Sequence, residues 1–223
     1  MKKVTLLATF AFGLFIASCG GDDTQKAETK EAQDKAKATE KSVKYTVNAD
    51  ESTINWEGSK TLVDSKHYGT VDLNQGTFTV KGDNIESGNF VIDMTSIKNE
   101  DLEDEEKNQK LVGHLKSDDF FSVEDHPNAT FEITQIEAIK KQKEGDDSTH
   151  KISGNLTIKG ISKNISFNAK VHLSGDDLHL AAKFKIDRSN WDVRFGSTSF
   201  FDDLGDKAIS DDIKLEVEVH ASK

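Results

Sequence analysis

The chain has 223 residues, of which 35% are hydrophobic and 31% are charged, and its formal net charge is −11 at pH 7. This length fits one β-barrel or β-sandwich with appendages. The acidic balance argues against binding to nucleic acid, because no basic stripe is available to neutralise phosphates. The single cysteine excludes an intrachain disulfide and a cysteine-based zinc site.

Residues 1–18 are typical of a signal peptide. A positively charged Met-Lys-Lys start precedes an apolar run over 4–17, which is too short to span a membrane. Ile-Ala-Ser directly before Cys19 resembles a bacterial lipobox with isoleucine in place of the usual leucine. We therefore expect Cys19 to be lipidated and to become the mature N-terminus. The alternative is an ordinary secretory peptide with an incidental cysteine near its cleavage site.

The segment after this cysteine has the composition of a linker. Residues 20–44 are rich in Lys, Glu, Asp, Ala, Gln and Thr and contain no aromatic residue. Such a segment cannot bury a core of its own. We expect residues 19–44 to be the lipidated start of a disordered tether, followed by a folded domain over 45–223.

Period-two alternation of apolar and polar residues recurs along the rest of the chain, which predicts strands with one apolar face. The alternating segments are 54–56, 76–80, 90–94, 129–133, 156–158, 165–173, 178–186 and 213–221. Glycine- and aspartate-rich turns between several of them favour antiparallel hairpins. About eight such strands predict a closed antiparallel up-and-down barrel that can hold one small ligand. A two-sheet sandwich is the alternative.

One stretch lacks this alternation. Residues 103–117 suit a short helix or ordered loop over one end of the barrel. The acidic run at 100–106 lacks the Asp/Asn alternation and central glycine of an EF-hand loop, so we interpret it as solvated rather than as a calcium site.

Five motifs in order resemble the signature of the YceI-like family, from about residue 45 to the C-terminus. They are H-x-G and G-x-F at 67–69 and 76–78, Ser-Ile at 96–97, GHLKSDDFF at 113–121 with PNATF at 127–131, GNLTIKGISK at 154–163, and IDRS at 186–189. The next residues, 190–193, lack the glycine that often follows in the family. The continuation to 207 resembles the version found in lipoproteins of Bacteroidetes-type bacteria.

The resemblance implies an extended lipocalin-like barrel in the cell envelope, periplasm-facing or surface-exposed, that holds a long-chain isoprenoid or similar lipid. We expect binding, and also transport or storage, of that lipid, without a cofactor and without enzymatic activity. The alternative is a non-catalytic β-rich interaction or stress-protective module with a filled core. The expected partners are the lipid and, through the anchor, a membrane; an exposed edge strand could also support a homodimer.

Apolar residues of the alternating segments are the candidates for lining a lipid tube. They are Trp56, Phe78, Phe90, Ile92, Phe131, Ile133, Leu156, Ile158, Phe167, Leu180 and Phe184. For each of them, plain core packing is the alternative. Three cations could meet a polar or phosphorylated head group at the mouth, namely His67, Arg188 and Arg194, with structural ion pairs as the alternative.

The sequence gives little support to catalysis or metal binding. It has no nucleophile elbow, no HExxH and no glycine-rich phosphate loop. None of the seven histidines is paired at a metal-ligand spacing. His172 and His179 fall on the polar faces of adjacent predicted strands, and we interpret them as an exposed cross-strand pair.

Overall fold

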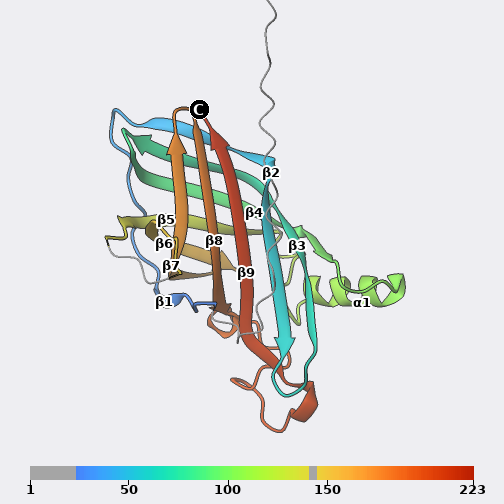
Figure 1. The fold of residues 1–223 in the computed structure, drawn as a ribbon. Helices are drawn as coiled ribbons and strands as arrows, with labels where there is room; N and C mark the ends of the chain where they lie inside the picture. Colours follow the sequence, from blue (N-terminus) through green and yellow to red (C-terminus); the bar gives the residue numbers. More distant parts are fainter. Residues whose placement is uncertain (1–23, 141–144) are drawn as a thin grey trace, which may run out of the picture.

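Eight long strands, β2 to β9, form a closed antiparallel barrel in which each strand pairs with the next one along the chain and β9 returns to β2 (Figure 1). The computed structural model describes residues 24–140 and 145–223. The strands are β2 Val43–Lys60, β3 Lys66–Lys81, β4 Asn84–Asn99, β5 Asn128–Ala138, β6 His150–Ile158, β7 Ile161–Ser174, β8 Asp177–Asp187 and β9 Ile209–Ser222. The barrel prediction is confirmed over the sandwich.

The alternation of the sequence becomes the two walls of the barrel. Along β8, Leu178, Leu180 and Phe184 are buried inside, whereas Lys183 lies on the outer face. The same alternation runs through the neighbouring strands, so one continuous apolar core lines the interior.

The predicted helix or ordered loop is a helix, α1 (Glu105–Lys116). The acidic run supplies its start: Asp104 caps the helix by accepting a bond from the Lys107 N–H at 3.0 Å, and Glu105 and Glu106 occupy the first turn. Carboxylates are favourable there because the N–H groups at a helix N-terminus point at them. These acidic residues therefore stabilise the helix.

Helix α1 and residues 117–127 lie beside the half of β4 that β5 does not cover. β4 and β5 pair only over five residue pairs, 89–93 with 128–132. Beyond them, the Lys116 side chain bonds the Thr95 carbonyl at 2.6 Å, and the Met94 N–H bonds the Pro127 carbonyl at 2.9 Å. This segment thus closes one side of the barrel.

The tether prediction is wrong for residues 24–42, which are ordered against the barrel. The short strand β1 (Glu28–Glu31) pairs with β7. Just before it, the Ala27 N–H donates to the Lys185 carbonyl at 2.8 Å, and the Lys185 N–H donates to the Gln25 carbonyl at 2.9 Å. An edge strand needs backbone partners rather than an apolar core, so a polar segment can be ordered in this way.

Residues 25–31 fill a gap between β7 and β8. These two strands pair directly over six residue pairs, 169–174 with 177–182. Beyond those pairs they separate, and residues 25–31 bond β7 on one side and β8 on the other; β1 lies beside the lower ends of both strands in Figure 1. The N-terminal segment therefore completes the wall of the barrel.

Past β1, the chain crosses the outer face of β6, β5 and β4. The buried Asn155 carboxamide accepts from the Gln33 N–H at 3.0 Å and donates to the Gln33 carbonyl at 2.6 Å. The Ala36 N–H then bonds the Ile133 carbonyl, and Thr39 bonds Glu86. Asn155 thus anchors the N-terminal segment at the point where the segment leaves the gap between β7 and β8.

The predicted signal peptide and Cys19 lie outside the described residues, so their roles stay predictions. Among the residues that the structure describes, no helix has the length and apolar character needed to cross a bilayer.

The Asn155→Ala variant tests whether Asn155 holds the N-terminal segment against the barrel through Gln33. It leaves both backbone groups of Gln33 without their partner under the segment, so we expect the free energy of unfolding to fall by about 1–3 kcal/mol. Lys35→Ala is the control, since it removes only an exposed ion pair with Glu132 and should cost about 1 kcal/mol or less. Urea denaturation of both variants gives the two values, and equal losses would contradict the role of Asn155.

Candidate functional site

The barrel encloses a cavity of about 220 Å³. Side chains from all eight barrel strands line it, and along β9 the lining runs from Ile209 to Val219. Ten residues of strand correspond to about 33 Å, so the lined space is long rather than round. Among the described residues, Arg188 and Ser210 are the polar ones in the lining.

Five phenylalanine rings form an arc across the inside of the wall. Neighbouring ring centroids lie 5.0, 6.2, 5.8 and 4.1 Å apart, and the last pair is stacked. The rings belong, in order, to Phe78, Phe90, Phe131, Phe167 and Phe184. Such contacts add to the stabilisation by apolar burial and give the cavity a continuous aromatic side.

A glycine makes room for the middle of this arc. Gly154 on β6 faces inward, and a Cβ there would lie 2.3 Å from the Phe131 ring. The missing side chain lets that ring lie close to β6 and reach Phe167 on the next strand.

The structure places all eleven predicted lining residues on the wall of the cavity, while their role in lipid binding stays a prediction. These are Trp56, Phe78, Phe90, Ile92, Phe131, Ile133, Leu156, Ile158, Phe167, Leu180 and Phe184. The sequence reasoning missed the wall formed by β9 and the segment around α1. The missed side chains include Leu115, Phe120, Phe121, Ile213, Leu215, Val217 and Val219. The alternation of residues 213–221 is the signal that could have found the β9 part.

Arg188, a head-group candidate, reaches the cavity but is occupied by the protein. It is 1% exposed, and its guanidinium donates to the carbonyls of Ser210, Val193 and Ile209 at 3.0, 2.8 and 3.3 Å. Asp211 lies 3.3 Å away as its ion-pair partner. Burial lowers the pKa of Arg188 from its ordinary value, and the Asp211 charge opposes this effect. Arg188 therefore fixes the chain that closes this end of the barrel.

His67, the second candidate, lies outside the cavity lining. Its Nδ1 is 2.8 Å from the Asp101 carboxylate, which also accepts bonds from the Tyr68 N–H and the Asn99 side chain. Partial burial would raise the pKa of Asp101, but these hydrogen bonds outweigh it and hold the pKa below its ordinary value. His67 thus belongs to a structural cluster at the rim.

Arg194, the third candidate, also lies outside the cavity lining. Its Nε is 2.6 Å from Asp192, and its guanidinium lies over the Phe200 ring at 5.0 Å. Of the three cations, Arg188 alone lines the cavity, and each of the three is paired with a carboxylate of the protein.

Aromatic side chains close this end of the barrel. The Trp191 side chain is fully buried and donates to the Leu156 carbonyl at 2.9 Å. The ring of Phe195 lies 4.4 Å from His114 and 5.7 Å from Phe120, which joins the chain after β8 to the chain around α1. Residues of both loops thus meet over the apolar space.

The fold and the interior define a closed antiparallel barrel with an apolar cavity, and the sequence comparisons give its family. The model of the YceI-like domain matches residues 45–221. The chain therefore belongs to the YceI-like family, as the motifs predicted.

Curated relatives cover part of the chain. The UPF0312 protein ECA1782 of Pectobacterium atrosepticum is 33% identical over 112 residues, which are 49% of this chain and 51% of the relative. Protein YceI of Salmonella arizonae is 34% identical over 112 residues, with the same shares. The chain spans about half the length of the curated relatives it matches.

Two solved structures share the fold. BcnA of Burkholderia cenocepacia superposes with a TM-score of 0.55 at 22% identity and covers 79% of this chain and 99% of its own. A polyisoprenoid binding domain from Saccharophagus degradans, implicated in plant cell wall breakdown, also gives a TM-score of 0.55, at 14% identity, with coverages of 80% and 97%. At these identities the likeness establishes the fold alone.

Exchange of each arginine for methionine separates their roles. Arg188→Met removes the donors to three carbonyls and leaves Asp211 without its ion-pair partner, so we expect a loss of about 3–5 kcal/mol in the free energy of unfolding. Arg194→Met removes an exposed pair and should cost about 1 kcal/mol or less.

Urea denaturation of the two variants measures the difference. If Arg188→Met is too unstable to purify, Arg188→Lys keeps the charge while losing the planar donor set, and an intermediate loss is expected. A stable Arg188→Met protein with an unchanged transition would contradict the structural role.

Proposed function

We propose that this protein binds a long-chain isoprenoid or a similar lipid inside the barrel. The observation that carries the proposal is the long apolar cavity, with its aromatic arc and few polar groups among the described residues that line it. Burial of hydrocarbon contributes about 0.8 kcal/mol per CH₂. A buried segment of ten carbons would therefore contribute about 8 kcal/mol, before the entropy cost of ordering the chain.

The shape of the cavity supports a chain-like ligand. Its lining extends over about 33 Å of β9, the length of a long hydrocarbon rather than that of a compact ring system. Recognition rests on the chain, because the three candidate head-group cations are bonded to carbonyls or paired with carboxylates of the protein. The head group of the ligand would then lie at the mouth or outside it.

The family context supports the same ligand class. One structure with this fold is described as a polyisoprenoid binding domain. Combined with the predicted lipid anchor at Cys19, this favours transport or storage of a lipid in the cell envelope, next to a membrane. A homodimer through an exposed strand edge remains a prediction of the same kind.

The cavity favours lipid binding over an interaction module with a filled core. A filled barrel would leave no space beside the phenylalanine arc, whereas here about 220 Å³ is open. A hydrolase would need convergent acid and base groups at this space. Arg188 and Ser210, the polar residues of the described lining, are not such a pair. We therefore propose a binding function without catalysis.

Organic extraction of the purified protein, followed by mass spectrometry, tests the ligand class. We expect a prenyl or acyl lipid at a stoichiometry near one. A protein that yields no lipid, and that binds no prenyl lipid added in detergent, would exclude the proposed function.

Filling the cavity gives a matched test on one strand. Ala129 on β5 lines the cavity, so Ala129→Phe places a ring where the lipid chain would lie. Thr130→Phe adds a ring of the same kind at the next residue, which points to the other face. We expect prenyl-lipid binding at least about tenfold weaker in Ala129→Phe only, since one lost methylene contact costs about 0.8 kcal/mol and several are lost.

Circular dichroism of both variants checks folding, and Ala129→Leu serves as a smaller filler if the phenylalanine is not accommodated. Equal lipid loading in Ala129→Phe and Thr130→Phe would contradict binding in this cavity.

A further inference from the structure

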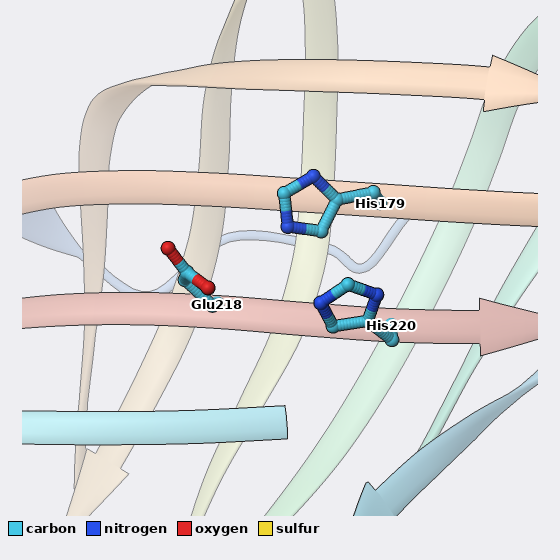
Figure 2. A group of neighbouring side chains, drawn as sticks. All are labelled: His179, Glu218 and His220. Carbon is cyan, nitrogen blue, oxygen red and sulfur yellow. The ribbon is translucent and has the colours of Figure 1, made fainter. Parts of the chain in front are cut away.

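The outer face of the barrel carries a histidine pair that the cavity does not explain. His179 on β8 and His220 on β9 stand directly opposite each other in the strand register, and their ring centroids lie 4.3 Å apart. Glu218 precedes His220 by two residues and shares its face. Figure 2 shows the three side chains pointing away from the two strands on the same side, with the carboxylate beside the imidazoles.

The three side chains bring one possible ligand atom each close together. One ligand atom of each residue lies within 4.8 Å of the others. In a tetrahedral zinc site with bonds of about 2.0–2.1 Å, ligand atoms are about 3.4 Å apart. The described groups therefore need shifts of about 1 Å, which side-chain rotations can provide.

One imidazole nitrogen of His179 has no use in the fold. His179 Nε2 is buried, and no hydrogen-bond partner for it exists in the part of the chain that the structure describes. Buried polar atoms are normally bonded, so an orphaned imidazole nitrogen needs an explanation. Burial, together with the neighbouring His220, lowers the pKa of His179 from its ordinary value.

The surroundings hold the pair in place and leave space above it. The backbone N–H of His220 donates to Ser52 Oγ at 3.1 Å, and that hydroxyl donates to the Asn48 carbonyl at 2.7 Å, so the irregular part of β2 fixes β9. A depression of about 190 Å³ lies over both imidazoles, with Glu51 and Asp177 among its walls. An entering cation would meet acidic groups and reach both rings.

We propose that His179, His220 and Glu218 bind one divalent transition-metal ion, for which Zn²⁺ fits best. Two imidazoles and one carboxylate are a ligand set that zinc takes in proteins, whereas Mg²⁺ and Ca²⁺ prefer oxygen ligands alone. His172 stands opposite His179 on β7 but is not in the group of residues whose ligand atoms lie within 4.8 Å of one another, so the fourth position is left to water. The site ties β8 to β9 on the wall of the barrel and is separate from the cavity.

Titration of the full-length chain, purified without a polyhistidine tag, tests the site. We expect one equivalent of Zn²⁺ to bind in isothermal titration calorimetry with a Kd below about 10 μM, and no comparable binding of Mg²⁺. His179→Gln and His220→Gln should weaken this binding at least 100-fold, and Glu218→Gln about tenfold. His126→Gln is the matched control, because it removes one imidazole elsewhere and should leave the affinity unchanged.

A second measurement does not depend on variants. Zinc bound at this site should protect His179 and His220 from modification by diethyl pyrocarbonate, as read by peptide mass spectrometry, while His126 reacts as before. The proposal is overturned if no zinc binds at 100 μM, if His179→Gln and His126→Gln bind it equally, or if zinc leaves the modification of all seven histidines unchanged.

Discussion

Closure of the sheet is the constraint on which the rest of this structure depends. In a barrel whose strands all pair along their full length, the wall has no gaps. Here two pairs of adjacent strands stop pairing partway along their length. β7 and β8 stay paired over 169–174 and 177–182, and β4 and β5 over 89–93 and 128–132. The unpaired part of β8 and the unpaired end of β4 lie at the same level of the barrel. Successive strand pairs connect them through Leu215, Trp56 and Gly69, so both gaps open at the same end. At that end β5 and β7 lose their direct pairing to β4 and β8. The cavity is lined from both sides of the two gaps.

Each gap is closed by a segment outside the eight strands, and each uses the interaction that its position allows. Between β7 and β8, residues 25–31 act as an added strand, so backbone hydrogen bonds suffice and the side chains can be charged. Beside β4, the closing segment contributes Leu115, Phe120 and Phe121 to the interior, so apolar burial holds it. Arg188 joins the end of the barrel to the returning chain through three carbonyls, a role that suits its fixed fork of donors. The polar groups that close the barrel are thus bonded to one another in the wall, and the surface that faces the cavity stays apolar.

The sequence predicted the parts of this structure that follow from local periodicity. Alternation identifies the strands and their inward residues because side chains of a strand change face at every step, and all eleven predicted lining residues face the cavity for this reason. The N-terminal segment was misjudged because composition reports on the ability to bury a core, whereas this segment is held by backbone partners far away in the chain, such as Lys185 and Asn155. For the three cations, the sequence leaves a head-group role and a structural ion pair open. Their partners, the carbonyls around Ser210 for Arg188 and Asp101 for His67, are set by tertiary structure that spacing does not reveal.

The same rule of alternation explains how one barrel can carry two unrelated chemistries. Leu180 and Val219 face the cavity, and the residues next to them in the chain, His179 and His220, lie on the outer face, directly opposite each other across the strand pair. The histidines lie 41 residues apart in the sequence, beyond any spacing that identifies a metal site, and they meet only because β8 and β9 are in this register. Outward positions of a strand can be replaced by polar residues without a change in the side chains that form the apolar core, because those occupy the inward positions. The inner wall is therefore fixed by the need to bury apolar surface, and the outer wall is free to acquire a site of its own.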